Sequence, residues 1–317
     1  MENYINIKTF LVDNGTDSLS DAIQNIIDQN PNRTIFFPDG EYVLDKPLVT
    51  SSDPKKSVCL KLSDYAHLKV ADDWPKKQPM IRIGGKDFVN NIETPGSNFG
   101  IEGGILNCCG VATGISLDSG RETYIRYTSI KNAVIGIHIK NGINNGSADA
   151  DVFNVNITGN DERDSIGVLV EGLDNTLTNI RIGHVFIGVY LNRGATILRN
   201  IHPLYYVTSP SYPEYSESIG FYISPTGGRS WFENCYSDNF ATGFRTSSGK
   251  GFFTDCYCFW YSAEEERHVA FASDVPFDGR INGMEIGGRH LPDHPNKFAE
   301  NLVLTENGIV EGIHFMK

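Results

Sequence analysis

The sequence predicts an all-β solenoid, a parallel β-helix, and three observations support this fold class. Six segments read glycine, apolar, variable, apolar, and successive glycines lie 22, 31, 21, 32 and 23 residues apart. A basic step near 22 residues with occasional insertions is typical of a repeat in which stacked segments share one core. A second periodic series lies between the first, and period-2 alternation runs through both. The repeat glycines are Gly114, Gly136, Gly167, Gly188, Gly220 and Gly243.

The second series consists of a small polar residue followed by an apolar one, with steps of 25, 25, 21, 34 and 21 residues. Asn, Asp and Ser tolerate the left-handed backbone conformation and hydrogen-bond to their own backbone, which suits a corner between strands. Stacked corner asparagines can also bond to one another along the solenoid. We expect corners at Ser129, Asn154, Asn179, Asn200, Asn234 and Asp255.

One helix is expected near the start, over residues 18–29. Leu19, Ala22, Ile23, Ile26 and Ile27 share one face, and polar residues stand at the N-cap. Asn30-Pro31 ends the helix, and a strand, a turn and a strand follow over residues 34–44. Such a helix would cover the open end of the first coil.

Three of these N-terminal segments resemble the cap of the pectate-lyase-like superfamily of right-handed β-helices. They are Asn14-Gly-Thr-Asp, Asp21-Ala-Ile-Gln and Ile35-Phe-Phe-Pro-Asp-Gly-Glu-Tyr. The resemblance implies a right-handed parallel β-helix with an N-terminal capping α-helix, carbohydrate chemistry and, in many members, assembly as trimers. The hydrolase motifs of polygalacturonase-like members and the calcium-and-arginine arrangement of pectate lyases are not recognisable here, so no catalytic residue is carried over.

The chain of 317 residues is expected to form a single β-helix domain over 1–317. Residues 1–50 would hold the cap and first strands, about 51–262 the coils, and about 263–317 final coils or a C-terminal cap. Two further strands are expected after the period is lost, over residues 281–288 and 302–310.

Composition limits the partners. A net charge of −12 disfavours nucleic acid and anionic membranes, and no apolar run reaches membrane length. The start carries no signal-peptide pattern, which suggests a cytoplasmic location, or else a virion protein or a secreted protein whose leader was removed. We expect no cofactor and no metal, because no cysteine pair has metal spacing; Asp149 and Asp151 are a weak calcium alternative. Cys235 and Cys256 are expected to stack as buried free thiols.

Alternation assigns the faces of the glycine-led strands. The first and third residues after each glycine point inward, and the second and fourth point outward, with neighbouring coils about 4.8 Å apart. One outward column is Ser116, His138, Leu169, Tyr190, Tyr222 and Arg245, and the other is Asp118, Lys140, Glu171, Asn192, Ser224 and Ser247.

Asp118, Lys140 and Glu171 are the first candidates for catalysis. Two rungs would separate the two carboxylates by about 9.6 Å at the backbone, within side-chain reach of the spacing in an inverting glycosidase. Lys140 would keep one of them ionised. The alternative is an ordinary salt-bridged face. His138 and Glu233 are further acid or base candidates.

Substrate binding is assigned to the outward aromatic and basic residues. Tyr190 and Tyr222 would form a flat platform for a sugar ring, with Arg245 on the next coil. The long insertion over residues 203–217 carries Tyr205 and Tyr212 and is rich in Pro, Tyr and Glu, as expected of a loop that grips carbohydrate.

Three functions follow. The first is a carbohydrate-active enzyme, a glycoside hydrolase or an enzyme that rearranges glycosidic bonds, acting through paired carboxylates on an oligo- or polysaccharide. The second is a polysaccharide lyase or epimerase that uses Lys140, His138 or Arg245. The third is a non-catalytic structural β-helix, such as a phage tail protein that binds a receptor. In each case the partner is a carbohydrate, and a homotrimer is possible.

Overall fold

The computed structural model describes residues 4–11, 18–88, 99–141, 149–206, 208, 212–261 and 267–316. The chain forms two compact units, Met1–Asn160 and Asp161–Lys317. In each unit the strands form two parallel sheets. The first sheet of a unit carries the corner residues, and the second sheet carries the repeat glycines.

The first unit begins with two helices and continues as parallel strands. Its helices are α1 (Ile7–Leu11) and α2 (Leu19–Gln29). Its first sheet contains β1 (Tyr4–Asn6), β2 (Thr34–Phe37), β3 (Gly40–Leu44), β5 (Cys59–Leu62), β6 (Ala66–Val70), β8 (Gly100–Glu102), β9 (Ile105–Asn107), β11 (Tyr124–Arg126), β12 (Ser129–Ala133) and β14 (Asp151–Gly159). Its second sheet contains β4 (Leu48–Ser51), β7 (Pro79–Lys86), β10 (Thr113–Leu117) and β13 (Ile135–Ile139).

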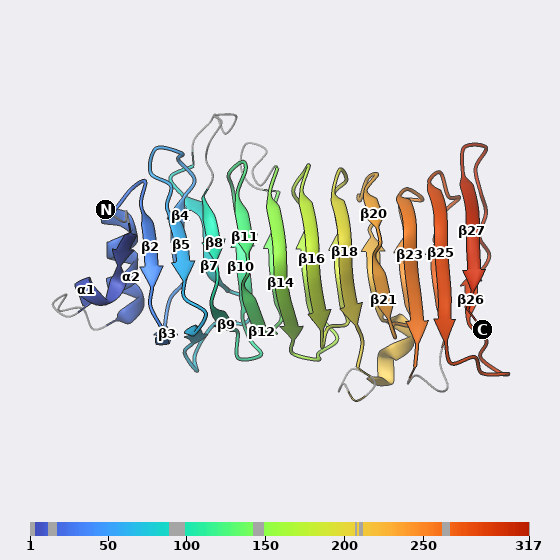
Figure 1. Cartoon of the computed structure of the whole chain (residues 1–317), viewed down its shortest axis with the longest axis horizontal. Helices are drawn as coiled ribbons and strands as arrows, with labels where there is room; N and C mark the ends of the chain where they lie inside the picture. The colour runs from blue at the N-terminus through green and yellow to red at the C-terminus, as the bar shows by residue number, and fades with distance from the viewer. Residues whose placement is uncertain are drawn as a thin grey trace. The chain divides into compact units, whose positions relative to one another are not determined.

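The second unit has the same alternation of strands, which follow one another side by side (Figure 1). Its first sheet contains β16 (Thr176–Gly183), β18 (Ile197–Leu204), β20 (Trp231–Glu233), β21 (Tyr236–Asp238), β23 (Phe252–Trp260), β25 (Arg280–Gly288) and β27 (Ile309–Phe315). Its second sheet contains β15 (Ile166–Val170), β17 (Ile187–Leu191), β19 (Ile219–Ile223), β22 (Thr242–Thr246), β24 (Val269–Ser273) and β26 (Lys297–Ala299). A short 3-10 helix, η1 (Tyr212–Glu217), lies between β18 and β19.

The strands pair in parallel from coil to coil, and their register follows the repeat. Val168 pairs with Val189, Val189 with Phe221, and Phe221 with Phe244. Equivalent positions of successive repeats therefore stack, as the glycine spacing predicts. The fold is the expected right-handed parallel β-helix, in keeping with the handedness of parallel crossovers.

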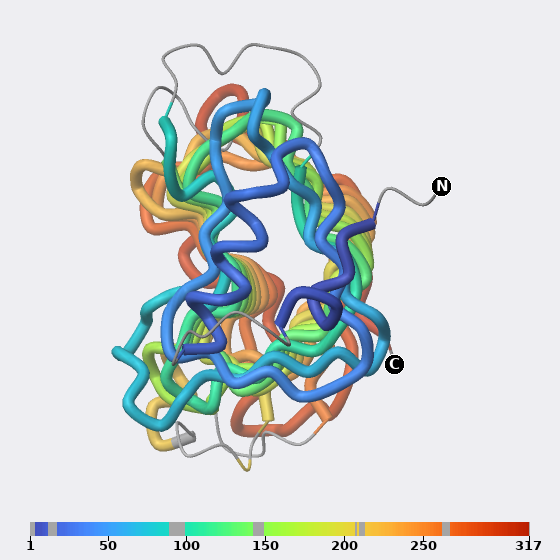
Figure 2. The backbone as a smooth tube through the Cα atoms, turned by 90° about the vertical axis from the view of Figure 1, so that its left-hand side faces the viewer, coloured from blue at the N-terminus to red at the C-terminus, as the bar shows by residue number. Residues whose placement is uncertain are grey.

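Helix α2 caps the first coil of the first unit, and both helices stand in front of the first strands in Figure 2. Ser18 is the N-cap, and its hydroxyl accepts a hydrogen bond from the Asp21 amide at 3.2 Å. Ala22, Ile23, Ile26 and Ile27 are buried, and the helix packs against β3 and β4. The predicted capping helix is confirmed. No helix among the described residues is long and apolar enough to cross a membrane.

The repeat glycines are required by close approach of neighbouring coils. A Cβ atom on Gly188 would lie 2.4 Å from the carbonyl oxygen of Gly220 and 2.5 Å from Cβ of Pro203. Gly167 and Gly220 would meet the next coil's glycine carbonyl at 2.5 and 2.7 Å. These distances are shorter than any real Cβ contact, so the glycine column reflects packing between rungs.

The corner residues adopt the left-handed conformation that the second series predicts. Asn179, Asn200, Asn234 and Asp255 have φ values between 50° and 55°. The Asn200 side-chain amide donates to Oδ1 of Asn179 at 3.1 Å, which confirms a hydrogen bond between stacked corners.

The predicted corner at Ser129 is wrong. Tyr127 has a φ of 55° and occupies the corner of its coil. Its amide bonds to the carbonyl of Phe153, the residue before the corner Asn154, so Tyr127 and Asn154 lie at equivalent positions. Ser129 pairs with Asn156 instead, two residues further along the strand. A tyrosine in this conformation is uncommon, so a search for small polar residues misses it.

The core lies between the two sheets of each unit, and the predicted inward positions are buried. They include Ile115, Leu117, Val168, Val170, Phe221 and Phe244, all at most 1 % exposed. Ser116, Asp118 and Ser224 lie in the predicted outward columns but are also buried, at 0 %, 5 % and 1 % exposed. The register is therefore right, whereas the expected exposure of these three side chains is wrong.

The described residues 267–316 form further coils. β24 pairs with β22, and β25 and β27 continue the first sheet of the second unit. The strand expected over 281–288 is confirmed, but the strand expected over 302–310 begins only at Ile309. Cys235 and Cys256 are buried free thiols, as predicted, and burial raises the pKa of both.

Candidate functional site

The outer side of the second sheet in the second unit gathers most of the predicted binding residues. Tyr190 pairs with Tyr222, Tyr222 pairs with Arg245, and Arg245 pairs with Ala272 on consecutive strands. The residues of the adjacent column directly follow the last residue of each strand. We call this surface the tyrosine face, and it comprises Glu171, Tyr190, Asn192, Tyr222, Arg245, Ser247 and Asp274. Ser224 belongs to the same column but is only 1 % exposed.

Tyr190 and Tyr222 form an aromatic pair on neighbouring rungs. Their ring centroids lie 5.0 Å apart, and their planes meet at 50°. The predicted flat platform is therefore wrong, because the tilt makes a faceted surface with rings at two orientations. Both side chains are half-buried. Burial, followed by the neighbouring Tyr222 and the charge of Glu171, raises the pKa of Tyr190, so its hydroxyl stays protonated.

A chain of polar groups runs beside the tyrosines. The Asn192 amide lies 3.4 Å from Oε1 of Glu171, and the Ser224 hydroxyl donates to Oδ1 of Asn192 at 2.7 Å. Thr226 donates to the same oxygen at 2.7 Å. These contacts orient the amide and bring donors and acceptors together along three rungs.

Arg245 completes this surface and is itself neutralised. Its guanidinium lies 5.9 Å from the Tyr222 ring centroid and donates to the Asp274 carboxylate at 3.1 Å. Ser247 bonds to the same carboxylate, and the Tyr222 hydroxyl lies 3.0 Å from the Ser247 hydroxyl. The tyrosine face thus carries two hydrogen-bonded groups, one around Asn192 and one around Asp274, and its one arginine is paired.

The predicted catalytic carboxylate Asp118, in the first unit, is held between two cations. Arg82 donates to its Oδ2 at 2.7 Å, and the Lys140 amine lies 2.8 Å from its Oδ1. Burial alone would raise the pKa of Asp118, but the Lys140 and Arg82 contacts outweigh it and hold the pKa below its ordinary value. This carboxylate has the surroundings of a structural ion pair. Glu171 belongs to the second unit, so its pairing with Asp118 stays a prediction.

The other predicted site residues lie outside the tyrosine face. Tyr205 is 1 % exposed and packs on Tyr215 with ring centroids 5.3 Å apart, so its predicted role in binding substrate is wrong. The Tyr212 side chain lies outside the described residues, although its backbone begins η1. Glu233 is paired with Arg199 at 2.6 Å. His138 is half-buried, and its strand position pairs with that of Ser116.

Two histidine–aspartate pairs in the second unit escape sequence reasoning. Nδ1 of His184 lies 2.8 Å from Asp161, and Tyr206 stacks on the imidazole with centroids 4.0 Å apart. Nε2 of His202 lies 3.4 Å from Asp238. The partners come from neighbouring coils, 23 and 36 residues away in sequence. In the sequence, the one sign of these pairs is that each histidine and its aspartate are about one coil apart.

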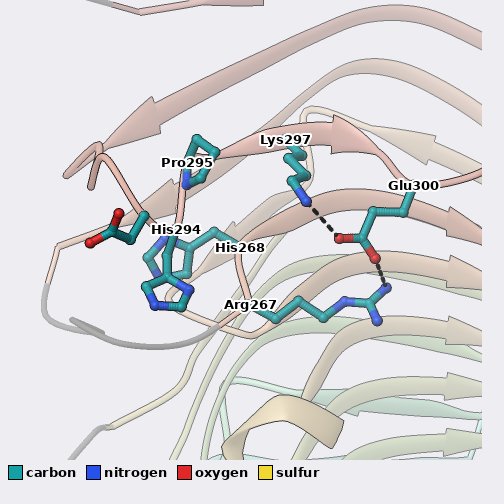
Figure 3. Close-up of a pocket in the computed structure, with 7 residues that line it drawn as sticks. Arg267, His268, His294, Pro295, Lys297 and Glu300 are labelled. Carbon is teal, nitrogen blue, oxygen red and sulfur yellow. Dashed lines mark hydrogen bonds and ion pairs between the residues drawn. The ribbon is translucent and has the colours of Figure 1, made fainter.

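A pocket lies at the end of the second sheet of the second unit (Figure 3). Its volume is ≈ 370 Å³, within the range of small-molecule sites. We call it the histidine pocket, and its lining consists of Arg267, His268, Asp293, His294, Pro295, Lys297 and Glu300. The repeat pattern is lost after residue 262, so no pattern in the sequence marks this pocket.

Asp149 and Asp151, the predicted weak calcium ligands, are each paired with an arginine. Asp149 pairs with Arg121 at 2.5 Å, and Asp151 pairs with Arg126 at 2.6 Å. Residues 142–148 between the two strands lie outside the described residues. Within the described part of the chain, no cluster of three or more histidine, cysteine or acidic side chains has the geometry of a metal site.

No protein-family model matches the chain, and no curated protein matches its sequence. Among solved structures, a double mutant of the tailspike protein of E. coli bacteriophage HK620 superposes with a TM-score of 0.66 at 10 % identity, covering 98 % of this chain and 67 % of the tailspike. The same tailspike in complex with a pentasaccharide gives a TM-score of 0.63 at 11 % identity, with the same coverage.

A bacterial surface protein has the same architecture. PfbA, a surface adhesin of Streptococcus pneumoniae, superposes with a TM-score of 0.59 at 10 % identity and covers 98 % of this chain and 91 % of the adhesin. At such identities the likeness concerns the fold alone. The chain is therefore a right-handed parallel β-helix of the architecture found in a phage tailspike and a bacterial adhesin.

Proposed function

We propose that the chain recognises a neutral carbohydrate on its tyrosine face and acts as a receptor-binding β-helix. The observation that carries the proposal is the pair of half-buried tyrosines, Tyr190 and Tyr222, on consecutive rungs. Tyrosine offers large, rigid and amphipathic contact area at a low cost in conformational entropy. A sugar ring has the matching character, with apolar C–H groups on its faces and hydroxyls at its edge.

The polar groups of the tyrosine face favour a neutral sugar. A hydroxyl both donates and accepts hydrogen bonds, and the half-buried side chains of Asn192 and Ser247 offer both kinds of partner on this face. Arg245, which would attract an anion, is already paired with Asp274. The chain as a whole carries a net charge of −12, which repels a polyanionic glycan.

The fold likeness agrees with this reading. The HK620 tailspike is described in complex with a pentasaccharide, and PfbA is described as a surface adhesin. Both superpose on this chain as parallel β-helices. We carry only this general role to the present chain, namely recognition of carbohydrate by a β-helical scaffold.

Hydrolysis by a carboxylate pair receives less support. Glu171 and Asp274 share the tyrosine face, but four rungs separate them, or about 19 Å at the backbone. A glycosidase pair lies no more than about 9.5 Å apart. Glu233 is paired with Arg199, and Asp118 with Arg82 and Lys140. We therefore favour recognition over cleavage.

A glycan array of neutral and acidic bacterial surface polysaccharides tests the proposal. We expect binding to at least one neutral polysaccharide, with affinity reduced at least about tenfold, or about 1.4 kcal/mol, by Tyr222→Ala. The matched control is Tyr65→Ala, which removes a 74 % exposed tyrosine of the first unit. Binding to acidic polysaccharides alone, or equal loss in both variants, would contradict the proposal.

We also propose that the chain assembles as a homotrimer, as its resemblance to the superfamily implies. Trp231 and Tyr261 are 41 % and 48 % exposed beside the first sheet of the second unit, and such side chains supply apolar contact area. Light scattering coupled to gel filtration should give the mass of three chains. The mass of one chain would contradict the proposal.

A further inference from the structure

The histidine pocket has a rigid polar floor. His268 is 2 % exposed, and its Nδ1 lies 2.9 Å from Oδ1 of Asn296. The Asn296 amide nitrogen donates to the Gly287 carbonyl at 3.1 Å, so its oxygen is the acceptor and Nδ1 of His268 carries the proton. The imidazole also stacks on Trp260, with ring centroids 5.2 Å apart. Each contact limits rotation of the ring, so the floor is preorganised.

One wall of the pocket is a carboxylate shared by two cations. Glu300 lies 3.3 Å from the Arg267 guanidinium and 3.2 Å from the Lys297 amine, and Figure 3 shows it between them. All three side chains remain between 32 % and 48 % exposed. The guanidinium has five N–H donors and the amine three, so each keeps donors beyond those that Glu300 accepts.

The pocket continues the tyrosine face along the solenoid. Phe271 pairs with Ala299, which places Glu300 on the rung after Ala272, in the column that contains Tyr222 and Arg245. Ala272 has a short side chain between Arg245 and Glu300. Four rungs, about 19 Å, separate the backbone of Tyr190 from that of Glu300. A pyranose ring is about as long as one rung spacing, so a short oligosaccharide spans this distance.

The charges of the pocket suit a neutral sugar. Arg267 and Lys297 balance Asp293 and Glu300 in formal charge, with neutral histidines. A hydroxyl suits this balance, because it can accept a hydrogen bond from a cation and donate one to a carboxylate. The volume of ≈ 370 Å³ accommodates a ring with its substituents.

We propose that the histidine pocket is the subsite for the terminal neutral sugar of the glycan that lies on the tyrosine face. The inference rests on the proposed carbohydrate recognition. It specifies in which direction the bound glycan runs and where its terminal sugar lies. The glycan runs parallel to the solenoid, from Tyr190 toward the C-terminal rungs, and its terminal ring enters between His294, Lys297 and Glu300.

The first test uses single sugars as probes. Methyl glycosides of glucose, galactose, mannose, rhamnose and N-acetylglucosamine are titrated into the full chain, with sodium glucuronate as the charged comparison. The reporters are the imidazole NMR resonances of His268 and His294. We expect at least one neutral glycoside to shift both imidazoles. Shifts from glucuronate alone, or from no probe, would overturn the inference.

The second test separates this inference from the proposed function. His294→Ala and Lys297→Gln should each weaken binding of the polysaccharide selected on the array by at least about fivefold. The control is His290→Ala, an exposed histidine of the same loop outside the pocket lining. If Tyr222→Ala weakens binding but the pocket variants match His290→Ala, the terminal subsite is refuted and the tyrosine face stands. If all variants bind as wild type, both proposals fail.

Discussion

At the scale of single residues, the neighbours of a side chain decide its role. Asp118 and Glu171 follow equivalent strands, yet Asp118 is 5 % exposed between Arg82 and Lys140, whereas Glu171 is half-buried beside Asn192. The repeat predicts the column of each carboxylate. It says nothing of Arg82, which reaches Asp118 diagonally from the neighbouring strand, because side-chain direction is not periodic in sequence.

Asp118→Asn provides a test of this ion pair. The folded-state pKa of Asp118 lies below its ordinary value, so the charged form stabilises the first unit above about pH 4. That contribution is lost as the pH falls through the folded-state pKa. We expect the substitution to lower the free energy of unfolding by about 2 kcal/mol near neutral pH. The free energy of unfolding of the variant should also fall less steeply with decreasing pH than that of the wild type, as measured by urea unfolding over a pH series.

The control for this experiment is Asp151→Asn, which removes a more exposed ion pair with Arg126 in the same unit. Exposed pairs contribute at most about 1 kcal/mol. An equal effect of both substitutions would show that Asp118 is not specially stabilised by its two cations.

At the scale of elements, the repeat was predictable because backbone contacts between rungs impose it. The glycine column follows from the approach of Gly188 to the Gly220 carbonyl, and the corner series follows from left-handed asparagines such as Asn200. The repeat has exceptions at positions where a residue of another type adopts the backbone conformation of the corner or of the glycine column. Tyr127 occupies a corner, and Ala270 stands in the next coil where Gly243 makes its close contact.

Gly188→Ala tests the packing explanation. The added Cβ would meet both the Gly220 carbonyl and Pro203, so neighbouring rungs must separate. We expect a loss of about 1–3 kcal/mol in the free energy of unfolding, as for overpacked cores, measured by chemical denaturation. Ala270→Gly, the reverse change in the same sheet, should cost no more than about 1 kcal/mol. Tolerance of Gly188→Ala would refute the steric role of the column.

At the scale of the whole molecule, the sequence predicts the periodic part of the fold and only part of the candidate site. Tyr190, Tyr222 and Arg245 could be placed on neighbouring rungs because they lie within the repeat. The histidine pocket lies beyond residue 262, where residue spacing no longer encodes position. Its wall depends on Glu300 meeting Arg267 across 33 residues of sequence. Contacts of this kind follow from the three-dimensional path of the chain.

The central claim is that the tyrosine face holds the glycan, and a crystal structure of the chain with an oligosaccharide from the selected polysaccharide tests it most directly. We expect sugar rings against Tyr190 and Tyr222, with the glycan running toward Glu300. An oligosaccharide seated on the first sheet of either unit, with the tyrosine face bare, would contradict it.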